Sequence, residues 1–260
     1  MKQELIKPII KVGNSAGVLL PKEWINGRAQ VKLIERPPDI KKDVLEILDR
    51  YLEDILGIYI VGSYARSEET KRSDIDILAI TENESMNIIK NKYNIILIPK
   101  IAVERTLNSN ILPLLPMLKE AKPIINRKLI EDYKKTLLNK KNLRFYIETG
   151  KSALKMNKAS INLDKQWPSN CGDAVAYSLT LRLRSSYIID SIIKGRKWSN
   201  DEFIKIIKRV SGSLRAYEGY LRIKDNRPQK EELPIKEAEK LHDHILKKIN
   251  EHEKWVKRKS

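Results

Sequence analysis

The sequence is poor in the residues that build disulfides and metal clusters. Its 260 residues include one cysteine, Cys171, and three histidines. A single cysteine excludes a disulfide within the chain and gives no cysteine cluster for a metal, which is typical of proteins from a reducing compartment. We therefore expect a cytoplasmic protein.

Long apolar runs are also missing. No stretch approaches the roughly 18 consecutive apolar residues that a membrane-spanning helix needs. The start, Met1-Lys2-Gln3-Glu4, lacks the apolar core of a signal peptide. The sequence therefore predicts no membrane segment.

Acidic residues are outnumbered by basic ones. The chain has 51 lysines and arginines against 34 aspartates and glutamates, a formal charge of +17 with a pI near 9.7. Such a balance favours polyanions as partners. A lysine-rich composition is also typical of thermophilic sources, and the two interpretations are compatible. With 41% hydrophobic residues, the chain is long enough to bury a core in one or two domains.

Two short motifs carry the strongest signal. Gly62-Ser63-Tyr64-Ala65-Arg66 follows a short β-rich run, and Ser73-Asp74-Ile75-Asp76 comes next along the chain. A glycine at the end of a strand lets the backbone approach a phosphate, and serine adds a hydroxyl donor. Alternation along a strand places Asp74 and Asp76 on one face, where two carboxylates suit Mg²⁺. Each motif alone is more often structural, but their joint spacing favours a site for a metal-bound nucleoside triphosphate.

These motifs resemble the signature of the minimal nucleotidyltransferases of the DNA polymerase beta superfamily. The resemblance implies that Gly62 and Ser63 contact the triphosphate, with Arg66 and Ser73 also in the substrate site. It also implies that Asp74 and Asp76 are the catalytic ligands of Mg²⁺. The implied reaction moves a nucleoside monophosphate from a nucleoside triphosphate, with ATP as the expected donor.

The expected third acid is missing from the next predicted strand. Where the family has an acidic residue, the run Tyr93-Asn94-Ile95-Ile96-Leu97-Ile98 has Asn94. Asparagine cannot act as a base, and the loss of one anionic ligand weakens a two-metal site. Glu104, a few residues beyond this strand, is an alternative source of the third acid, although its sequence neighbours are more typical of a solvated charge on a helix. Ser67 replaces a glycine that is usual in the family.

The first 36 residues have the pattern of a very small β unit. The run from Ile9 to Trp24 predicts a strand, a glycine-rich turn at Gly13-Asn14-Ser15, a second strand and a short helix or turn begun at Pro21. A last strand is predicted over residues 30–35. Because fewer than about 40 residues cannot bury a useful core, this unit needs a second copy and predicts a homodimer.

Residues 5–36 resemble the AbrB/MazE-type swapped-hairpin DNA-binding domain, in which Gly-Asn-Ser precedes a small residue, a glycine and Pro-Lys. The resemblance implies DNA as a partner, held by phosphate contacts and hydrogen bonds. The candidate DNA-binding residues are Lys7, Lys11, Asn14, Ser15, Lys22 and Arg28. A unit that serves only for dimerisation remains the alternative.

Consecutive prolines in Arg36-Pro37-Pro38-Asp39 predict a linker after this unit. The predicted domains are residues 1–36, a linker over 37–41, a nucleotidyltransferase domain over 42–128 and a helical domain over 129–260. In the second domain we expect a helix over residues 40–56 with Asp39 as its N-cap, and a proline-interrupted helix or loop over 103–118. A short strand over 120–125 completes a small mixed sheet.

After Asn126 the periodicity becomes helical. Helices are predicted over residues 128–138, 143–157, 173–194, 201–220 and 235–257, with Ser199 as a cap. The resulting bundle loosely resembles the helical partners of minimal nucleotidyltransferases. We expect its three histidines at the surface. Its arginines and tyrosines either line an RNA or nucleotide groove or pack as helix edges, and the second interpretation is favoured. These histidines, arginines and tyrosines are His242, His244, His252, Arg182, Arg184, Arg209, Arg215, Arg222, Tyr187, Tyr217 and Tyr220.

The sequence thus predicts a multidomain α+β protein: a small swapped-hairpin β unit, a mixed-sheet nucleotidyltransferase domain and a C-terminal all-α bundle. One functional hypothesis is a DNA-tethered enzyme that moves a nucleoside monophosphate, with Mg²⁺, to a hydroxyl of a protein, an RNA or a small molecule. The alternative is a dimeric DNA-binding regulator or antitoxin whose nucleotidyltransferase domain is weak or inactive. Asn94 is the residue that discriminates between them.

Overall fold

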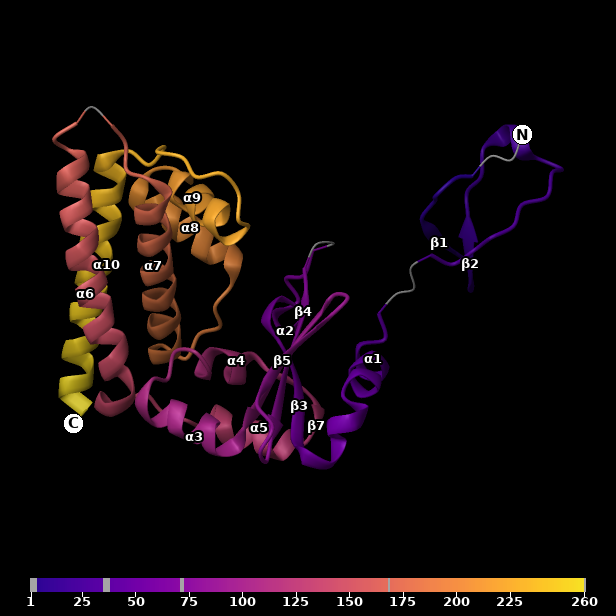
Figure 1. Ribbon diagram of the computed structural model, residues 1–260, viewed down its shortest axis with the longest axis horizontal. Coiled ribbons are helices and arrows are strands. Elements are labelled where there is room, and N and C mark those ends of the chain that lie inside the picture. The colour runs from indigo at the N-terminus through magenta and orange to yellow at the C-terminus, as the bar shows by residue number, and fades with distance from the viewer. Residues whose placement is uncertain (1–3, 35–37, 71–72, 168, 260) are drawn as a thin grey trace. The chain divides into compact units, whose positions relative to one another are not determined.

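The computed structural model describes residues 4–34, 38–70, 73–167 and 169–259 (Figure 1). It divides into two compact units, Met1–Asp43 and Val44–Ser260. Within the described residues, no helix is both long enough and apolar enough to cross a membrane.

The first unit contains the predicted hairpin. Strands β1 (Ile9–Val12) and β2 (Ser15–Val18) pair antiparallel, with Val12 opposite Ser15. Gly13 takes a φ of +57° in the two-residue turn, a conformation that favours glycine. A 3₁₀ helix, η1 (Lys22–Trp24), follows Pro21 as expected. The predicted last strand is wrong over residues 30–34, because the described chain offers this segment no paired strand; residue 35 lies outside the described residues.

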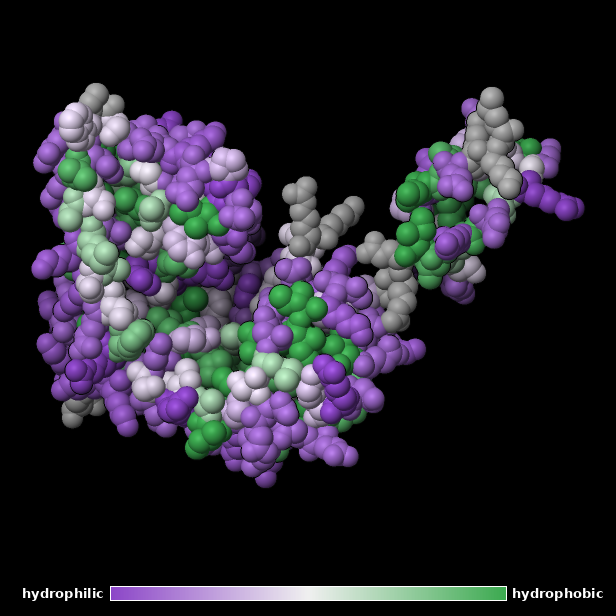
Figure 2. All heavy atoms as spheres, viewed as in Figure 1, coloured by the Kyte–Doolittle hydropathy of each residue, from purple (hydrophilic) through white to green (hydrophobic). Residues whose placement is uncertain are grey.

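Apolar side chains of the first unit are exposed rather than packed. None of residues 4–34 is buried, and Ile6, Val31 and Ile34 are 85%, 69% and 71% exposed. Figure 2 shows hydrophobic residues at the surface of this unit. In the predicted linker, Arg36 and Pro37 lie outside the described residues, whereas Asp39 accepts a hydrogen bond from the Lys42 N–H at 3.2 Å and caps α1 (Ile40–Ile47) as predicted.

The second unit begins with a five-stranded mixed sheet. Its strands are β3 (Ile55–Val61), β4 (Ile75–Thr81), β5 (Met86–Lys90), β6 (Tyr93–Pro99) and β7 (Lys122–Ile125). They lie in the order β5-β6-β4-β3-β7, and β4 pairs parallel with β6 while the other pairs are antiparallel. The mixed sheet confirms the predicted fold class. Strand β5 was not predicted, since its polar Asn87 and Lys90 interrupt the apolar pattern of an edge strand.

Short helices connect these strands. The helix predicted over residues 40–56 is shorter: α1 is followed by the 3₁₀ helix η2 (Asp49–Asp54), and β3 already starts at Ile55. Ile55 pairs with Thr81, so sheet pairing overrides the helical periodicity there. Helix α2 (Gly62–Arg66) follows β3 directly, and the proline-interrupted segment forms α3 (Lys100–Ser109) and α4 (Leu115–Glu120).

The rest of the unit is helical, as predicted. It comprises α5 (Arg127–Lys134), α6 (Lys140–Asp164), α7 (Asp173–Ile193), α8 (Asn200–Ser211), α9 (Arg215–Lys224) and α10 (Ile235–Lys259). Helices α6, α7 and α10 pack side by side (Figure 1). The single helix predicted over residues 201–220 is broken at Gly212, which ends α8 with a φ of +102°. Ser199 caps α8 as predicted, accepting the Glu202 N–H at 3.0 Å.

Two histidines that were expected at the surface are buried. His252 is 2% exposed and lies between the Asp190 carboxylate at 2.8 Å and the Tyr146 hydroxyl at 2.9 Å. His242 is 6% exposed and hydrogen-bonds the Leu154 carbonyl at 3.2 Å. The expectation was wrong because both rings find hydrogen-bond partners inside the bundle, which removes the cost of burying them.

One hydrophobic core joins the sheet to the helices. Leu78 and Ile80 of β4 belong to the same buried cluster as Leu143 of α6 and Leu179 of α7. Because side chains alternate along a strand, Asp76 lies on the same face of β4 as Leu78 and Ile80. The start of this face is therefore beside the helical region, where the candidate site lies.

Candidate active site

The turn between β3 and α2 is packed directly against β4. Gly62 has a φ of +69°, and a Cβ added to it would lie 2.5 Å from Oδ2 of Asp76. Any other residue would therefore clash with this carboxylate as well as strain the backbone. The structure confirms that the Gly-Ser pair follows a strand, and it brings the turn and Asp76 into contact.

The two aspartates of the motif lie at the start of β4. Asp76 is half-buried and stands opposite Val61 of β3, while its neighbours Ile75 and Ile77 are fully buried on the other face. Asp74 precedes β4 by one residue and is exposed. Ser73 is used inside the preceding loop, where its hydroxyl accepts the Thr70 N–H at 2.9 Å.

Asn94 occupies the position next to Asp76 on the neighbouring strand. The parallel pairing of β4 and β6 puts the two residues in register, and the Asn94 amide donates to Oδ1 of Asp76 at 3.0 Å. Within the described ranges, no three histidine, cysteine or acidic side chains are grouped so that they could hold a metal. Binding of a cation by Asp74 and Asp76 therefore stays a prediction.

Glu104 acts electrostatically on another part of the fold. The pKa of Tyr133 on α5 is raised to about 12, mainly by burial and to a lesser extent by the negative charge of Glu104. The charge of Glu104 thus acts on a tyrosine that does not belong to the metal motif.

Glu120, the last residue of α4, binds the turn from the other side. Its Oε1 accepts the Gly62 N–H at 2.7 Å, and its Oε2 accepts Nη1 of Arg66 at 2.7 Å. The same Oε2 accepts the indole N–H of Trp198 at 3.2 Å, and the Glu120 side chain is only 9% exposed. Sequence reasoning missed Glu120, because nothing near it in the chain signals a contact with a residue 58 positions away.

Arg66 is held by two carboxylates. Besides Glu120, it donates from Nε to Oε2 of Glu68 at 2.8 Å. Burial favours the neutral form of the guanidinium, but the two carboxylates outweigh it and raise the pKa of Arg66. The hydroxyl of Ser63, by contrast, has no hydrogen-bond partner in the described part of the chain. Ser63 is thus the polar side chain of the turn that stays available to a ligand.

Ser67, where the family usually has glycine, ends α2 in the left-handed region with a φ of 59°. Lys122 of β7 reaches this end of the turn and donates to the Ser67 hydroxyl and the Tyr64 carbonyl, each at 3.2 Å. The turn is therefore anchored at its start by Glu120 and at its end by Lys122.

The connection between α7 and α8 closes over the turn. Trp198 contacts Glu120, and the Asn200 N–H donates to Oε1 of Glu68 at 3.2 Å. A small cavity of about 10 Å³, room for about one water molecule, is lined here by Arg66, Arg184 and Trp198 among others. The helical region thus forms one wall of the candidate site.

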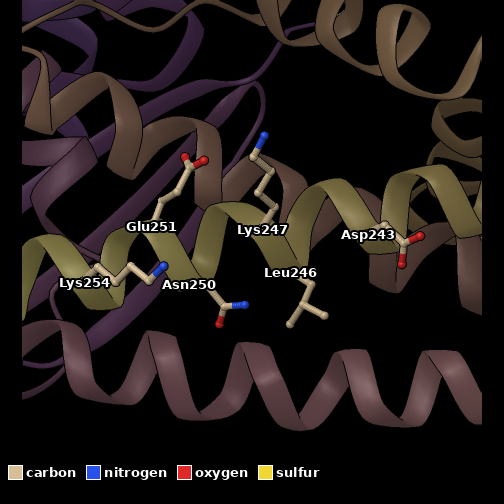
Figure 3. A pocket seen from close by; sticks show the side chains of 6 residues that line it. All are labelled: Asp243, Leu246, Lys247, Asn250, Glu251 and Lys254. Carbon is tan, nitrogen blue, oxygen red and sulfur yellow. The ribbon is translucent and has the colours of Figure 1, made fainter.

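A larger hollow of about 480 Å³ lies along α10. All of its lining residues come from that one helix: Asp243, Leu246, Lys247, Asn250, Glu251 and Lys254 (Figure 3). Their side chains point to both sides of the helix instead of converging on one point. Neither hollow has Ser63, Asp74 or Asp76 in its lining, so the candidate site stays at the turn of Gly62 beside Asp76.

The predicted DNA-binding residues all lie in the first unit. Asn14 is in the hairpin turn, Lys11 and Ser15 flank it on the two strands, and Lys7, Lys22 and Arg28 lie in the segments around them; all six are exposed. The structure brings them into one small unit, and their contact with DNA stays a prediction.

A comparison with known families agrees with the motif. A family model described as a nucleotidyltransferase domain matches residues 41–143. No curated protein matches the chain. A solved nucleotidyltransferase-like protein from Exiguobacterium sibiricum is 15% identical, with 82% of this chain and 75% of that chain covered and a TM-score of 0.36. Spectinomycin adenyltransferase from Enterococcus faecialis, solved with ATP and spectinomycin, is 14% identical, with 80% and 97% covered and a TM-score of 0.41.

The family match covers the parts of the chain that build the site: the turn at Gly62, both aspartates, Asn94 and Glu120. It does not extend to residues 5–36 or to most of the helical region. Residues 41–143 therefore have the sequence of a nucleotidyltransferase domain.

Proposed function

We propose that this protein transfers a nucleoside monophosphate from a nucleoside triphosphate, with ATP as the expected donor, to an acceptor hydroxyl. The observation that carries the proposal is the close approach of Gly62 to Asp76, which leaves no room for a Cβ at position 62. Phosphate-binding backbone and a metal-binding carboxylate have to be this close if both are to act on one triphosphate. The nucleotidyltransferase match over residues 41–143 supports the same assignment.

The hydrogen bonds already made within the turn indicate which of its groups can contact the triphosphate. Gly62 already donates its N–H to Glu120, and the guanidinium of Arg66 is shared by two carboxylates. Direct contact with the triphosphate therefore falls to the Ser63 hydroxyl, while Glu120 and Arg66 hold the turn in shape. Such a rigid support keeps a ligand in a reactive position.

The donor set fits a hard divalent cation. Asp76 has one oxygen bonded to the Asn94 amide and the other against Gly62, and Asp74 adds an exposed carboxylate. Mg²⁺ commonly uses one or two carboxylates and completes its shell with waters and phosphate oxygens. When bound, Mg²⁺ would neutralise charge on the triphosphate and on the departing pyrophosphate.

Asn94 sets an expectation for the rate. Its amide orients Asp76 but cannot accept a proton from the acceptor hydroxyl. In-line displacement relies mainly on positioning and charge neutralisation, so transfer remains possible without a carboxylate at this position. We expect a slow enzyme.

Transfer is tested with labelled ATP, Mg²⁺ and a panel of acceptors, measuring both labelled product and pyrophosphate. The double variant Asp74→Ala/Asp76→Ala is expected to lose at least about a hundredfold in rate, as when a group that stabilises transition-state charge is removed. Asp243→Ala, which removes an exposed carboxylate of α10, serves as the control. The absence of label transfer and of pyrophosphate with every acceptor would reject the proposal.

A second function is favoured by the first unit. Its apolar side chains, such as Ile6 and Val31, are exposed in a single chain, and a second copy of the unit would cover them. This observation supports a homodimeric DNA-binding regulator, in the manner of an antitoxin, whose second unit holds nucleotide without rapid turnover. The two functions share the nucleotide site and differ in the fate of the bound nucleotide.

Dimerisation is tested by light scattering on the full chain. Val31→Asp is expected to shift the dimer toward monomer, while Leu137→Asp, at an apolar residue 78% exposed in the other unit, should not. Duplex DNA binding should weaken steeply between about 50 and 200 mM salt, and it should vanish when the residues before Arg36 are deleted. Equal binding by the shortened chain would reject the DNA assignment.

A further inference from the structure

The positive charge of this protein is concentrated in its helical region. Residues 40–126 contain 12 lysines and arginines and 13 acidic residues, a formal charge of −1. Residues 127–260 contain 32 basic and 17 acidic residues, a formal charge of +15. A lysine-rich composition inherited from the source would charge both segments. The excess is therefore a property of the helical region and points to a polyanionic partner there.

The connection between α7 and α8 carries part of this charge to the candidate site. Trp198 is fixed on Glu120, the residue that also binds Gly62 and Arg66. Arg196 and Lys197 come directly before Trp198, and both are exposed. Neither forms an ion pair within the described chain. Two exposed cations without an ion-pair partner among the described residues thus adjoin Trp198, which contacts Glu120.

The other edge of the turn is also basic. Lys122 is exposed and makes its hydrogen bonds with a carbonyl and a hydroxyl rather than with a carboxylate. Of the acids that contact the turn, Glu68 and Glu120 both bind the guanidinium of Arg66, and Asp76 faces Gly62 as a candidate metal ligand. An acceptor that approaches the turn therefore meets cations on both sides.

On the basis of the proposed function, we infer that the acceptor is the 3′-terminal hydroxyl of a single-stranded nucleic acid. Its backbone phosphates would lie against Arg196, Lys197 and Lys122, and its last nucleotide would present the hydroxyl to the triphosphate. A cationic acceptor such as an aminosugar would be repelled by the same side chains. RNA and DNA share this chemistry, and the experiment distinguishes them.

Transfer to such an acceptor makes one bond and breaks one. The 3′ oxygen attacks the α-phosphorus and forms a new O–P bond. The bond from the α-phosphorus to the oxygen that bridges to the β-phosphorus breaks, and pyrophosphate leaves with that electron pair. The hydroxyl proton passes to solvent, since Asn94 cannot accept it. The strand is extended by one nucleotide.

The experiment uses the full chain with α-labelled ATP and Mg²⁺. The acceptors are single-stranded RNA and DNA of one sequence, each with a free or a phosphate-blocked 3′ end, and a cationic aminosugar. We expect label only on strands with a free 3′ hydroxyl. The more active of the two strand types identifies the natural acceptor class.

Charge reversal locates the acceptor on the protein. Arg196→Glu/Lys197→Glu is expected to lower kcat/KM for the strand at least about tenfold and to reduce the salt dependence by about two phosphate contacts, with KM for ATP unchanged. The control is Lys247→Glu/Lys254→Glu, which makes the same change in charge at exposed positions of α10, away from α2 in Figure 1. We expect this control to differ from the wild type by less than about twofold, as for a rim charge outside the contact.

Label on the aminosugar instead of the strands, or equal effects of the two double variants, would overturn the inference. If no acceptor yields pyrophosphate, the proposed function itself has failed, and fluorescence anisotropy with labelled RNA then tests the surface alone. Weaker binding by the Arg196→Glu/Lys197→Glu variant supports the surface. Binding lost only in Lys11→Glu assigns the nucleic acid to the first unit and overturns the inference.

Discussion

Carboxylates have different partners in the helical region and at the candidate site. In the helical region, Asp173 is 2% exposed and receives two hydrogen bonds from the guanidinium of Arg222, at 2.7 and 2.8 Å. At the site, the half-buried Asp76 has an amide partner, Asn94, at 3.0 Å, and its negative charge is left without a cation among the described residues. Both aspartates lie on regular elements of one unit, so the difference is in their partners.

We propose that this difference separates charges that support the fold from charges that bind a ligand. A buried ion pair loses stability when one partner is removed, because the other charge is left desolvated. An aspartate with no cation nearby slightly lowers the free energy of unfolding, and its negative charge is neutralised only when a cation binds. Substitutions in the helical region should therefore change stability, and substitutions at the site should change activity.

The largest expected effect on stability is that of Asp173→Ala. It removes the buried carboxylate of Arg222 and leaves this largely buried guanidinium only the exposed Glu232, at 3.2 Å. Breaking a buried pair costs about 3 to 5 kcal/mol. For a chain of this size, Tm should fall by roughly 10 °C. Thermal and urea unfolding measure the loss, and Asp225→Ala, which removes the exposed partner of Arg227, is the matched control. A similar loss in the control would mean that burial has no part in the effect.

Asn94→Asp should act in the opposite sense on activity. It places a third carboxylate beside Asp76, which supplies the acid expected in the family. Transfer should rise about a hundredfold, the low end of general base catalysis. Without metal, two like charges in register on neighbouring strands should destabilise the protein by up to about 1 kcal/mol. Rates and unfolding are measured with and without Mg²⁺.

Asn94→Ala is the control for this change, because it removes the hydrogen bond to Asp76 without adding a charge. We expect it to lower transfer. If Asn94→Asp leaves the rate unchanged at saturating Mg²⁺, the site is built to hold nucleotide, and the regulator becomes the better account of the protein.

The parts of the site that were predicted from sequence are those set by short spacing. Gly62 was identifiable because a turn follows a strand, and Asp76 because strands alternate. The family resemblance put Asn94 at the position of the third acid, and the register of β4 and β6 sets it opposite Asp76. Glu120 could not be predicted, since it meets Gly62 and Trp198 across 58 and 78 positions of the chain. Such contacts depend on tertiary packing and leave no periodic signal.

The same distinction explains the errors in the fold. Helical and strand periods identified most elements. Two boundaries differ: Ile55 pairs in the sheet instead of continuing a helix, and α8 ends at Gly212, before the predicted end of its helix. The buried state of His252 depends on Asp190 and Tyr146, which are distant in sequence. Local pattern thus predicted the type of each element, and non-local contacts decided its ends and its buried polar groups.

Asp190 gives the helical region a dependence on pH. Burial alone would raise the pKa of this carboxyl, but hydrogen bonds from His252 and Lys248 outweigh burial and hold the pKa well below its usual value. Because the folded state then binds the proton less tightly than the unfolded state, stability is present above the ordinary carboxyl pKa of about 3.9 and is lost as the pH falls from there toward the folded value.

We therefore expect the free energy of unfolding of the wild type to decrease as the pH falls below about 4. Asp190→Asn should be less stable at neutral pH and should show a smaller decrease on acidification. Asp243→Asn, at a carboxylate whose side chain is 73% exposed, should keep the wild-type slope. Equal slopes in all three proteins would show that the pairing of Asp190 contributes nothing to acid sensitivity.

The smallest effect is expected for an ion pair that is as short as the others but exposed. Arg144 and Glu148, one turn apart on α6, are 2.8 Å apart with side chains 74% and 60% exposed. Pairs of this kind contribute about 0.3 to 0.5 kcal/mol, because water already solvates both charges and salt screens them. Glu148→Gln should change the free energy of unfolding in urea by no more than this, and added salt should reduce the change further. The distance between Arg144 and Glu148 nearly equals that between Arg222 and Asp173. A loss as large as that of Asp173→Ala would therefore show that the loss of stability follows the distance between the charges and not their burial.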